Sequence, residues 1–300
     1  MAPGRNLRNV LEKTSITVTQ FTPILQLSTE ILSLMLLAAA IELYLHVVDW
    51  YECVWLGKTV PSGRIQDLPF GLLLKIASPD GASEADTLRF VRAHTTIPVP
   101  RVIASAEGFG RRYTIMTCVE GQNLELIWKE LKPLQRTKII GQLQSFTAQL
   151  RSLTTPHGPA VCALNGAALK DSRISSGTVG SFPDEDAFNE HLIEAAKPFM
   201  DESTLPGIRS RMRGDHAINF THGDLARRNI MVKEGEIAAI IDWEESGWYP
   251  EHWEYVKAMY NPGIDKDQSW VDQVRSIFPQ EYETDWLVDR ELSDHMYGAF

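Results

Sequence analysis

The chain has 300 residues, of which 44% are hydrophobic and 23% charged, and its formal net charge is −10 at pH 7. This composition is typical of a globular protein large enough for one large core or two moderate ones. The acidic excess argues against nucleic acid as a partner, because neutralising a polyanion needs a dense Lys and Arg surface. The three cysteines are odd in number and widely spaced, so we expect neither a disulfide framework nor a thiolate metal site, and we favour a cytoplasmic setting.

The chain begins with a mixed segment that leads into one long apolar run. Residues 1–30 show no sustained period and predict a poorly ordered or loosely helical lead-in. Residues 31–48 approach the length of about 20 that a membrane span needs, although Glu42 and His46 interrupt the run. We predict a buried or lobe-packing helix, with an interfacial or spanning helix as the alternative. A secretory signal is disfavoured, because a long polar-to-mixed stretch precedes the run.

A strand-rich region starts near Arg64. Short apolar runs bounded by Ser, Pro, Asp and Gly predict strands, whereas apolar residues at helical spacing after Ser83, a candidate N-cap, predict a helix. We therefore expect a strand at 72–76, a helix at 83–94 and strands at 102–106 and 113–119. The last two strands are joined by a segment with two glycines, which suits a hairpin loop.

Helical patterns dominate after Gly121. Apolar residues at i, i+3, i+4 and i+7 predict helices at 124–131, 134–153 and 184–200. Between them, residues 154–183 are rich in Gly, Ser, Thr and Pro and predict a long surface excursion, where we expect substrate-facing variation. A β-rich first lobe thus gives way to an α-rich second one.

The residue types needed for phosphoryl transfer surround two apolar strands, 229–232 and 237–241, which a KEGE turn joins. Asp224 and Asn229 stand in the order H-x-D-x-x-x-x-N, and Asp242 ends the second strand. Phosphoryl transfer needs divalent cations against the phosphate charge and a carboxylate near the attacking hydroxyl. A tight hairpin brings Asn229 and Asp242 to one end, where their oxygens can share Mg²⁺.

This pattern resembles the catalytic loop and metal-binding aspartate of the aminoglycoside/choline phosphotransferases. The resemblance implies an α+β, bilobal protein-kinase-like fold, with ATP and Mg²⁺ as cofactors and a small-molecule hydroxyl as acceptor. It also implies that Asp224 orients or deprotonates the acceptor, that Asn229 and Asp242 hold metal, and that His222 braces the loop.

Further landmarks of the same family occur in the matching order. Lys75 resembles the strand lysine that contacts the α- and β-phosphates, and Glu84 resembles its helix partner, with Asp86 as the competing carboxylate. The segment 113–121 is similar to the inter-lobe hinge. The resemblance implies that Met116 lines the adenine pocket and that Thr117 and Val119 offer backbone hydrogen bonds to the nucleotide.

These landmarks suggest three parts: an N-terminal extension at 1–48, a first lobe at 49–119 and a second lobe at 120–300. The chain also departs from kinase patterns. No G-x-G-x-x-G precedes Lys75, since Gly57, Gly63 and Gly71 are spaced differently. Gly follows His222 where protein kinases have Arg, and neither D-F-G nor A-P-E occurs.

Two further groups of residues have both a structural and a functional interpretation. The aromatic residues after Asp242 are interleaved with glutamates and predict a packed core beneath a solvated acidic face, or alternatively a pocket for a cationic acceptor: Trp243, Trp248, Tyr249, Trp253 and Tyr255. Five histidines lack metal-ligand spacing and are expected to be ordinary residues: His46, His94, His157, His191 and His216.

Two other functions fit the same fold. The first is a non-catalytic nucleotide-binding scaffold, favoured by the missing glycine pattern and opposed by the complete set of Asp224, Asn229 and Asp242. The second is a protein serine/threonine kinase, opposed by the absence of A-P-E and of Arg after His222. The identity of the acceptor does not follow from a fold.

Overall fold

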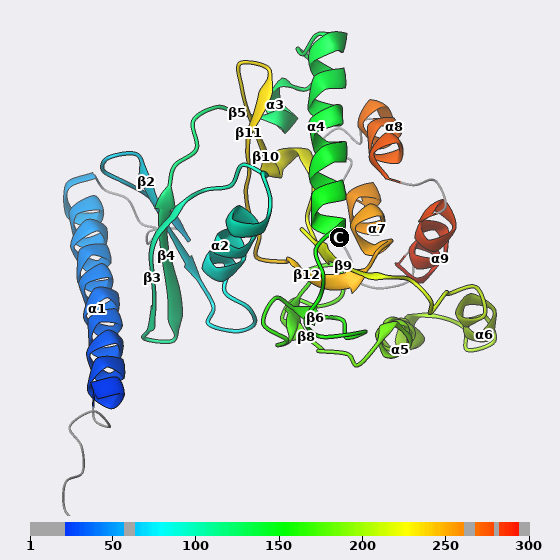
Figure 1. The fold of residues 1–300 in the computed structure, drawn as a ribbon, viewed down its shortest axis with the longest axis horizontal. Coiled ribbons are helices and arrows are strands. Elements are labelled where there is room, and N and C mark those ends of the chain that lie inside the picture. The colour runs from blue at the N-terminus through cyan, green and yellow to red at the C-terminus, as the bar shows by residue number, and fades with distance from the viewer. Residues whose placement is uncertain (1–21, 57–63, 261–267, 279–281, 294–300) are drawn as a thin grey trace, which may run out of the picture.

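The computed structural model describes residues 22–56, 64–260, 268–278 and 282–293, which form two lobes (Figure 1). The first lobe is an antiparallel sheet with strand order β1-β2-β4-β3. Its strands confirm the three predicted ones and add a short edge strand: β1 Ile65–Leu68, β2 Leu72–Ala77, β3 Val102–Gly108 and β4 Arg111–Thr117.

The two faces of this sheet are covered by different helices, α1 (Thr22–Leu56) and α2 (Glu84–His94), which lie on opposite sides in Figure 1. Successive strand residues point to opposite faces. Leu74 and Tyr113 accordingly belong to the cluster beneath α1, whereas Met116 packs with the residues of α2. Lys75, next to Leu74 in β2, therefore points away from α1.

Helix α1 packs on the sheet along one side, as predicted for residues 31–48. Ala38, Ile41 and Leu45 are buried against the strands. Glu42 accepts hydrogen bonds from the Tyr113 hydroxyl and from Arg111, so the carboxylate that interrupts the apolar run is used to dock the helix.

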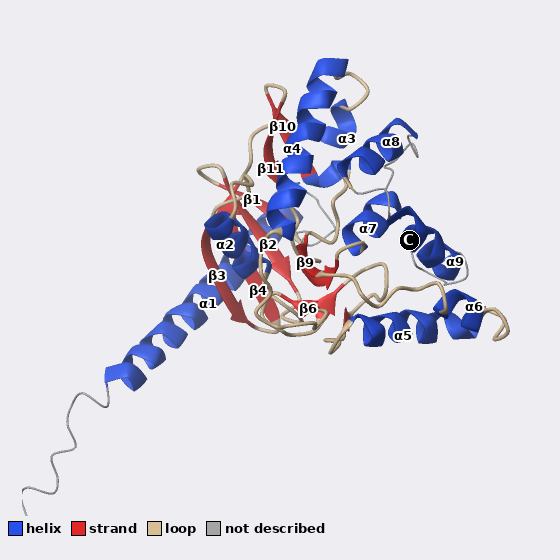
Figure 2. Ribbon diagram, turned by 45° about the vertical axis from the view of Figure 1, so that its right-hand side comes forward, coloured by secondary structure: helices blue, strands red, loops and turns tan. Residues whose placement is uncertain are grey.

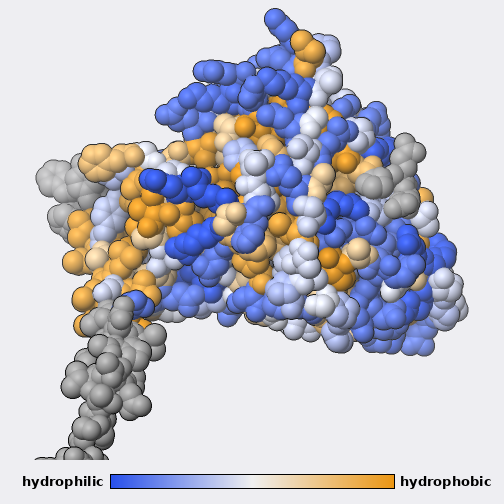
Figure 3. All heavy atoms as spheres, viewed as in Figure 1, coloured by the Kyte–Doolittle hydropathy of each residue, from blue (hydrophilic) through white to orange (hydrophobic). Residues whose placement is uncertain are grey.

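Within residues 30–48 of α1, most of the other side chains are apolar and exposed, and hydrophobic side chains gather at the left edge of Figure 3, where this helix runs. The large ones are Ile31, Leu32, Leu34, Met35, Leu36, Leu43, Tyr44 and Val47. By length and composition, Glu30–Val48 is able to cross a membrane. The interfacial or spanning alternative stays a prediction, and fractionation of the protein with and without residues 31–48 would decide it.

The second lobe is mainly helical, with short sheets at its junction with the first (Figure 2). Its α-helices include the three that the sequence predicts: α3 Leu124–Ile127, α4 Pro133–Arg151, α5 Glu185–Ala196, α6 Leu205–Arg209, α7 Trp253–Tyr260, α8 Gln268–Ile277 and α9 Glu283–Ser293. Its strands are β5 Gln122–Asn123, β6 Cys162–Ala163, β7 Leu169–Lys170, β8 Thr178–Val179, β9 Ile218–Thr221, β10 Ile230–Lys233, β11 Glu236–Ile240 and β12 Gly247–Pro250.

The excursion at 154–183 is more ordered than a surface loop. It contributes β6 to a sheet with β12 and β9, and its strands β7 and β8 pair with each other. Two-residue strands carry no readable alternation, which is why the sequence pattern missed them.

The aromatic residues after Asp242 form core, and the solvated acidic face predicted above them is wrong in part. All five rings are at most 1% exposed, so they offer no open aromatic surface to a cation. Glu245 and Glu254 are buried as well. Each is compensated by specific partners, because a buried carboxylate needs hydrogen bonds or an opposite charge; Glu245, for example, pairs with Lys257 at 2.5 Å.

The docking of α1 can be tested at its closest approach to the sheet. A Cβ placed on Gly108 of β3 would lie 2.9 Å from the Cβ of Ala38. We expect Ala38→Leu to lower the free energy of unfolding by about 1–3 kcal/mol, because the helix must lift off the strand. Leu36→Ala, at an exposed position of the same helix, is the control, and an unchanged urea midpoint for Ala38→Leu would refute this packing.

Candidate active site

Lys75 is the centre of an ionic cluster between the lobes. Its Nζ lies 2.8 Å from Glu84 Oε2 on α2, 2.5 Å from Asp242 Oδ1 after β11, and 4.0 Å from Glu244 Oε2. Burial alone would lower the pKa of Lys75, but these carboxylates outweigh it and hold the pKa above its ordinary value. The side chain therefore stays an ammonium in a buried position.

Glu84, and not Asp86, is the partner of Lys75. Glu84 is the first residue of α2 and is buried, and its Oε1 accepts the Trp243 backbone N–H at 3.1 Å. Asp86 is exposed and pairs with Arg89 on the same helix. The glutamate thus joins α2 both to β2 and to the segment that follows Asp242.

The catalytic-loop segment leaves β9 through His222, whose side chain braces it from inside. The His222 Nδ1 accepts the Asp224 N–H at 3.1 Å, and the Nε2 donates to the Ile241 carbonyl at 3.1 Å. Burial lowers the pKa of His222 to about 4, so the ring is neutral and keeps this donor and acceptor arrangement near neutral pH. The structural role predicted for His222 fits this geometry.

The backbone of the same loop is held by Glu254 of α7, which sequence reasoning did not single out for this role. Its two carboxylate oxygens accept the N–H groups of His222 at 2.6 Å and of Gly223 at 3.2 Å. Burial raises the pKa of Glu254 to about 7, although both N–H donors oppose the shift.

Gly223 explains why the position after His222 cannot carry Arg here. Its φ is +81°, and a Cβ at this residue would lie 2.3 Å from the Glu245 carbonyl oxygen. A side chain would meet fixed backbone and adopt a strained conformation. The glycine is therefore required by the close approach of the loop to the chain after Trp243.

Asp224 is held by two neighbours in the loop. The Arg228 guanidinium contacts both of its oxygens, at 2.6 and 2.8 Å, and Asn229 Nδ2 donates to Oδ2 at 2.7 Å. Burial raises the pKa of Asp224, while Arg228 and Asn229 act in the opposite direction. Arg228 was not identified from the sequence, although its position four residues after Asp224 is the signal that could have found it.

The hairpin of β10 and β11 brings Asn229 and Asp242 to the same end, as the sequence predicts. Ile230 pairs with Ile240, and the Ile241 N–H donates to the Asn229 carbonyl at 2.9 Å. Asp242 then adopts φ +64°, an uncommon conformation for a residue with a side chain. Burial pushes the pKa of Asp242 upward, but Lys75 outweighs it and the pKa is lowered.

One pocket of about 360 Å³ is lined both by Lys75 and its carboxylate partners and by the segment expected to form the hinge. Its lining includes Ile65, Leu73, Lys75, Glu84, Met116, Thr117, Val119, Asn229, Ile241 and Asp242. A mainly apolar pocket that also contains a few charged and polar groups has the character of a site for a base and its phosphates.

The hinge backbone is already partly engaged. The Thr117 N–H donates to the Arg101 carbonyl at 3.0 Å, and the Cys118 N–H donates to the Gly71 carbonyl at 2.8 Å. Neither N–H is open to a nucleotide, so the backbone hydrogen bond expected from Thr117 is limited to its carbonyl. The role expected of Val119 stays a prediction.

The structure describes only part of the segment that is expected to cover the phosphates. Gly57 and Gly63 lie outside the described residues. Gly71, with φ +69°, belongs to the tight turn between β1 and β2, next to an exposed Phe70 at φ +66°. A short hairpin turn thus precedes β2, the strand that carries Lys75.

The chain matches the family described as "Phosphotransferase enzyme family" over residues 71–292. Because this match covers well over half of the chain, the protein belongs to that family. A comparison with curated proteins finds no match.

The fold is that of the aminoglycoside phosphotransferases, a protein-kinase-like fold, as the sequence predicts. The chain resembles a ternary complex of aminoglycoside phosphotransferase APH(4)-Ia with AMP-PNP and hygromycin B, at 12% identity and a TM-score of 0.51 over 82% of this chain and 88% of that one. ADP-bound APH(2'')-Ib is similar at 12% identity and a TM-score of 0.52, over 81% and 84%. The gentamicin complex of APH(2'')-IIa gives 12% and 0.52, with 84% of each chain covered.

The bracing role of His222 predicts a pH effect on stability. The ring takes up a proton at about pH 6.5 when unfolded but only at about pH 4 when folded. The unfolded state therefore binds more protons between these values, and wild type loses up to about 3 kcal/mol through this residue as the pH falls across them.

We expect His222→Asn to lack this loss, because its side-chain oxygen can accept the Asp224 N–H without titrating. Urea unfolding of both proteins from pH 7 to pH 4 measures this loss. Glu254 changes the free energy of unfolding in the opposite direction over this range, but it does so in both proteins, so its effect cancels when the two free energies are subtracted. Parallel stability curves would contradict a neutral, buried His222.

Proposed function

We propose that this protein is an ATP-dependent phosphotransferase that moves the γ-phosphate to a hydroxyl of a small molecule. The observation that carries the proposal is one pocket lined by Lys75, Glu84, Asn229 and Asp242 together with the hinge segment from Met116 to Val119. The solved relatives in complex with AMP-PNP or ADP support a nucleotide in this position. The cytoplasmic setting expected from the cysteines stays a prediction.

The residues at the end of the hairpin fit a magnesium ion. Asn229 and Asp242 supply oxygen donors, and the lowered pKa of Asp242 keeps it ionised, which suits a hard cation. Such an ion would neutralise charge on the phosphates. Asp242 would then exchange Lys75 for the metal, and Lys75 would be free to contact the phosphate oxygens while Glu84 holds it in place.

Asp224 is the residue that would receive the proton of the acceptor hydroxyl. Its raised pKa improves it as a proton acceptor, since the best general base titrates closer to the working pH. Arg228 would leave one carboxylate oxygen when the hydroxyl arrives, and its guanidinium would then lie near the transferred group. The Thr117 carbonyl and the Val119 N–H would fix the base.

Two observations bear on the class of acceptor that we propose. Solved relatives bind hygromycin B and gentamicin, which supports a polyhydroxylated small molecule. The five rings after Asp242 are core, so a cationic acceptor would have to be recognised by carboxylates and not by aromatic faces.

Asp224→Ala should reduce kcat by about 10²- to 10⁴-fold, because the proton acceptor is lost, while the Kd for ATP with Mg²⁺ stays nearly the same. The measurement combines calorimetric nucleotide binding with phosphorylation of a panel of hydroxyl metabolites. Wild-type binding of ATP without turnover on any acceptor would favour the scaffold function, and transfer to protein substrates alone would favour a protein kinase.

Glu84→Gln tests the charge of Glu84 while it keeps the size and position of the side chain. It should destabilise the lobe by about 1.5–3 kcal/mol, because a charged hydrogen-bond partner is lost while Lys75 keeps Asp242, and it should raise the Kd for ATP. Asp86→Asn is the matched control on the same helix and should change neither quantity. Equal effects of both variants on nucleotide affinity would rule out a specific role for Glu84.

Arg228→Ala tests the partner of the proposed base. Removing the guanidinium should raise the pKa of Asp224 further, so the acidic limb of the kcat/KM profile should move to higher pH. Arg89→Ala, which breaks the exposed pair with Asp86, is the control and should leave the profile in place. An unshifted limb in Arg228→Ala would show that Asp224 is not the titrating base.

A further inference from the structure

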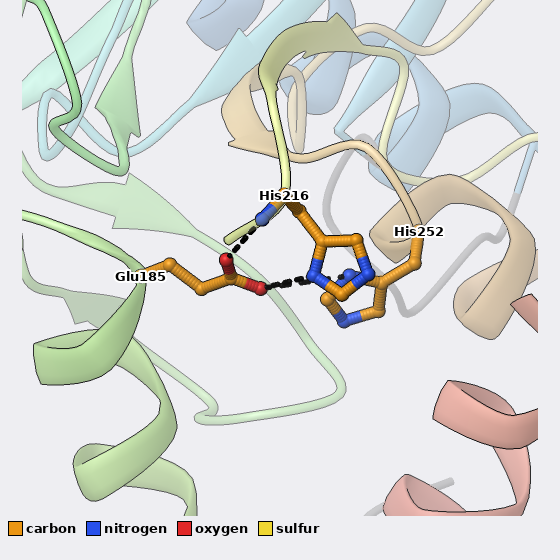
Figure 4. Close-up of side chains that lie close together, drawn as sticks. All are labelled: Glu185, His216 and His252. Atoms are coloured by element: carbon orange, nitrogen blue, oxygen red, sulfur yellow. Dashed lines mark hydrogen bonds and ion pairs between the residues drawn. The ribbon is translucent and has the colours of Figure 1, made fainter. Parts of the chain in front are cut away.

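A second polar cluster lies inside the helical lobe, built by residues outside the pocket described above. Figure 4 shows Glu185, His216 and His252 converging on one point from three separate segments. Glu185 begins α5, His216 precedes β9 and His252 precedes α7. All three are buried, and one candidate ligand atom from each lies within 4.8 Å of the other two.

The individual contacts give this cluster the geometry of a metal site. Glu185 Oε1 lies 2.6 Å from His216 Nδ1 and 3.8 Å from His252 Nδ1. Tetrahedral Zn²⁺ with bonds of about 2.0–2.1 Å spaces its ligand atoms about 3.3 Å apart. The two observed separations lie on either side of that value, and all three candidate atoms lie within 4.8 Å of one another, so side-chain rotations would bring them to the spacing of the ion.

A carboxylate behind the cluster lies next to one of the imidazoles. Asp285 Oδ2 of α9 lies 3.5 Å from His216 Nε2, on the opposite side of the ring from the Nδ1 that faces Glu185. A metal-binding histidine usually donates its other N–H to a carboxylate, which fixes the tautomer. His216 Nε2 and Asp285 Oδ2 have no hydrogen-bond partner among the described residues, so a small shift of the ring would allow this bond.

Two features of the cluster point to a missing ligand. His252 Nδ1 is buried without a hydrogen-bond partner, although it faces Glu185 Oε1, and such a group is costly unless something binds it. A cavity of about 20 Å³, lined by Asn189, His252 and Asp285 among others, adjoins the cluster. That volume is enough for one water molecule as a fourth ligand.

The charges of the cluster favour a divalent cation. Glu185 and Asp285 are both buried and face His216, at 2.6 and 3.5 Å. A buried carboxylate needs hydrogen bonds or an opposite charge. A divalent ion would neutralise both carboxylates and leave His216 free to bind as a neutral ring.

We propose that Glu185, His216 and His252 bind a divalent transition-metal ion, with Zn²⁺ the best match to two imidazoles and a carboxylate, and that Asp285 positions His216 for it. The ion joins α5, the segment before β9 and the start of α7, and through Asp285 it also reaches α9. Because Glu254 stands two residues after His252 and holds the backbone of His222 and Gly223, the site also stabilises the anchor of the catalytic loop.

The test measures Zn²⁺ in the full-length protein by elemental analysis after incubation with Zn²⁺ and dialysis against excess Mg²⁺. We expect one Zn²⁺ per chain in wild type and a thermal midpoint that falls when a chelator removes it. His252→Phe keeps a ring without nitrogen, and Glu185→Gln keeps the shape without the charge, so both should lose the ion. Asp285→Asn should weaken Zn²⁺ binding by about 10- to 100-fold.

Two control variants exclude other sites. His191→Gln removes a histidine of the same helix α5, and Asp242→Asn removes the proposed magnesium ligand; both should retain one Zn²⁺. The proposal requires first that the wild-type protein binds Zn²⁺. A negative result with wild type therefore cannot be explained by misfolding of a variant. No bound Zn²⁺ in wild type, full retention in His252→Phe, or loss in Asp242→Asn would overturn the proposal, and none of these results depends on kinase activity.

Discussion

The buried ammonium of Lys75 is the interaction on which the arrangement of the two lobes depends. It contacts carboxylates from both sides of the cleft, Glu84 on α2 and Asp242 after β11. A charge in this position is stable only with such partners. The alternation of β2 turns Lys75 away from α1, because its neighbours Leu74 and Ile76 pack in the cluster under that helix. The packing of the face under α1 therefore determines that Lys75 points into the cleft between the lobes.

The loop that carries Asp224 is positioned by a second set of buried acidic residues. Glu254 holds the loop backbone, and the Glu245 carbonyl lies so close to Gly223 that only glycine fits. Lys257 pairs with Glu245 and with Asp171 of the excursion. The acidic composition of the chain is thus partly an internal feature: several carboxylates organise the region around Asp224 and do not face solvent.

The sequence predicts the local features well and the long-range ones poorly. A single hairpin separates Asn229 from Asp242, and Asp224, five positions before Asn229, contacts it, so the spacing and the strand pattern are sufficient to predict these two neighbourhoods. Lys75 is recognisable as one cation in an apolar strand. By contrast, Glu254 reaches His222 from 32 positions away, and Glu185 reaches His216 from 31. No period or motif records such contacts, because the packing of separate helices determines them. Glu42 likewise looks like an interruption of α1 until its bond to Tyr113 is known.

The most direct test of this account is a crystal structure with a non-hydrolysable ATP analogue and Mg²⁺. The account predicts the adenine beside Met116, one Mg²⁺ shared by Asn229 and Asp242, and Lys75 moved from Asp242 to the phosphates while still paired with Glu84. A triphosphate bound outside this pocket, or a Lys75 that keeps Asp242 while the phosphates lie elsewhere, would contradict it.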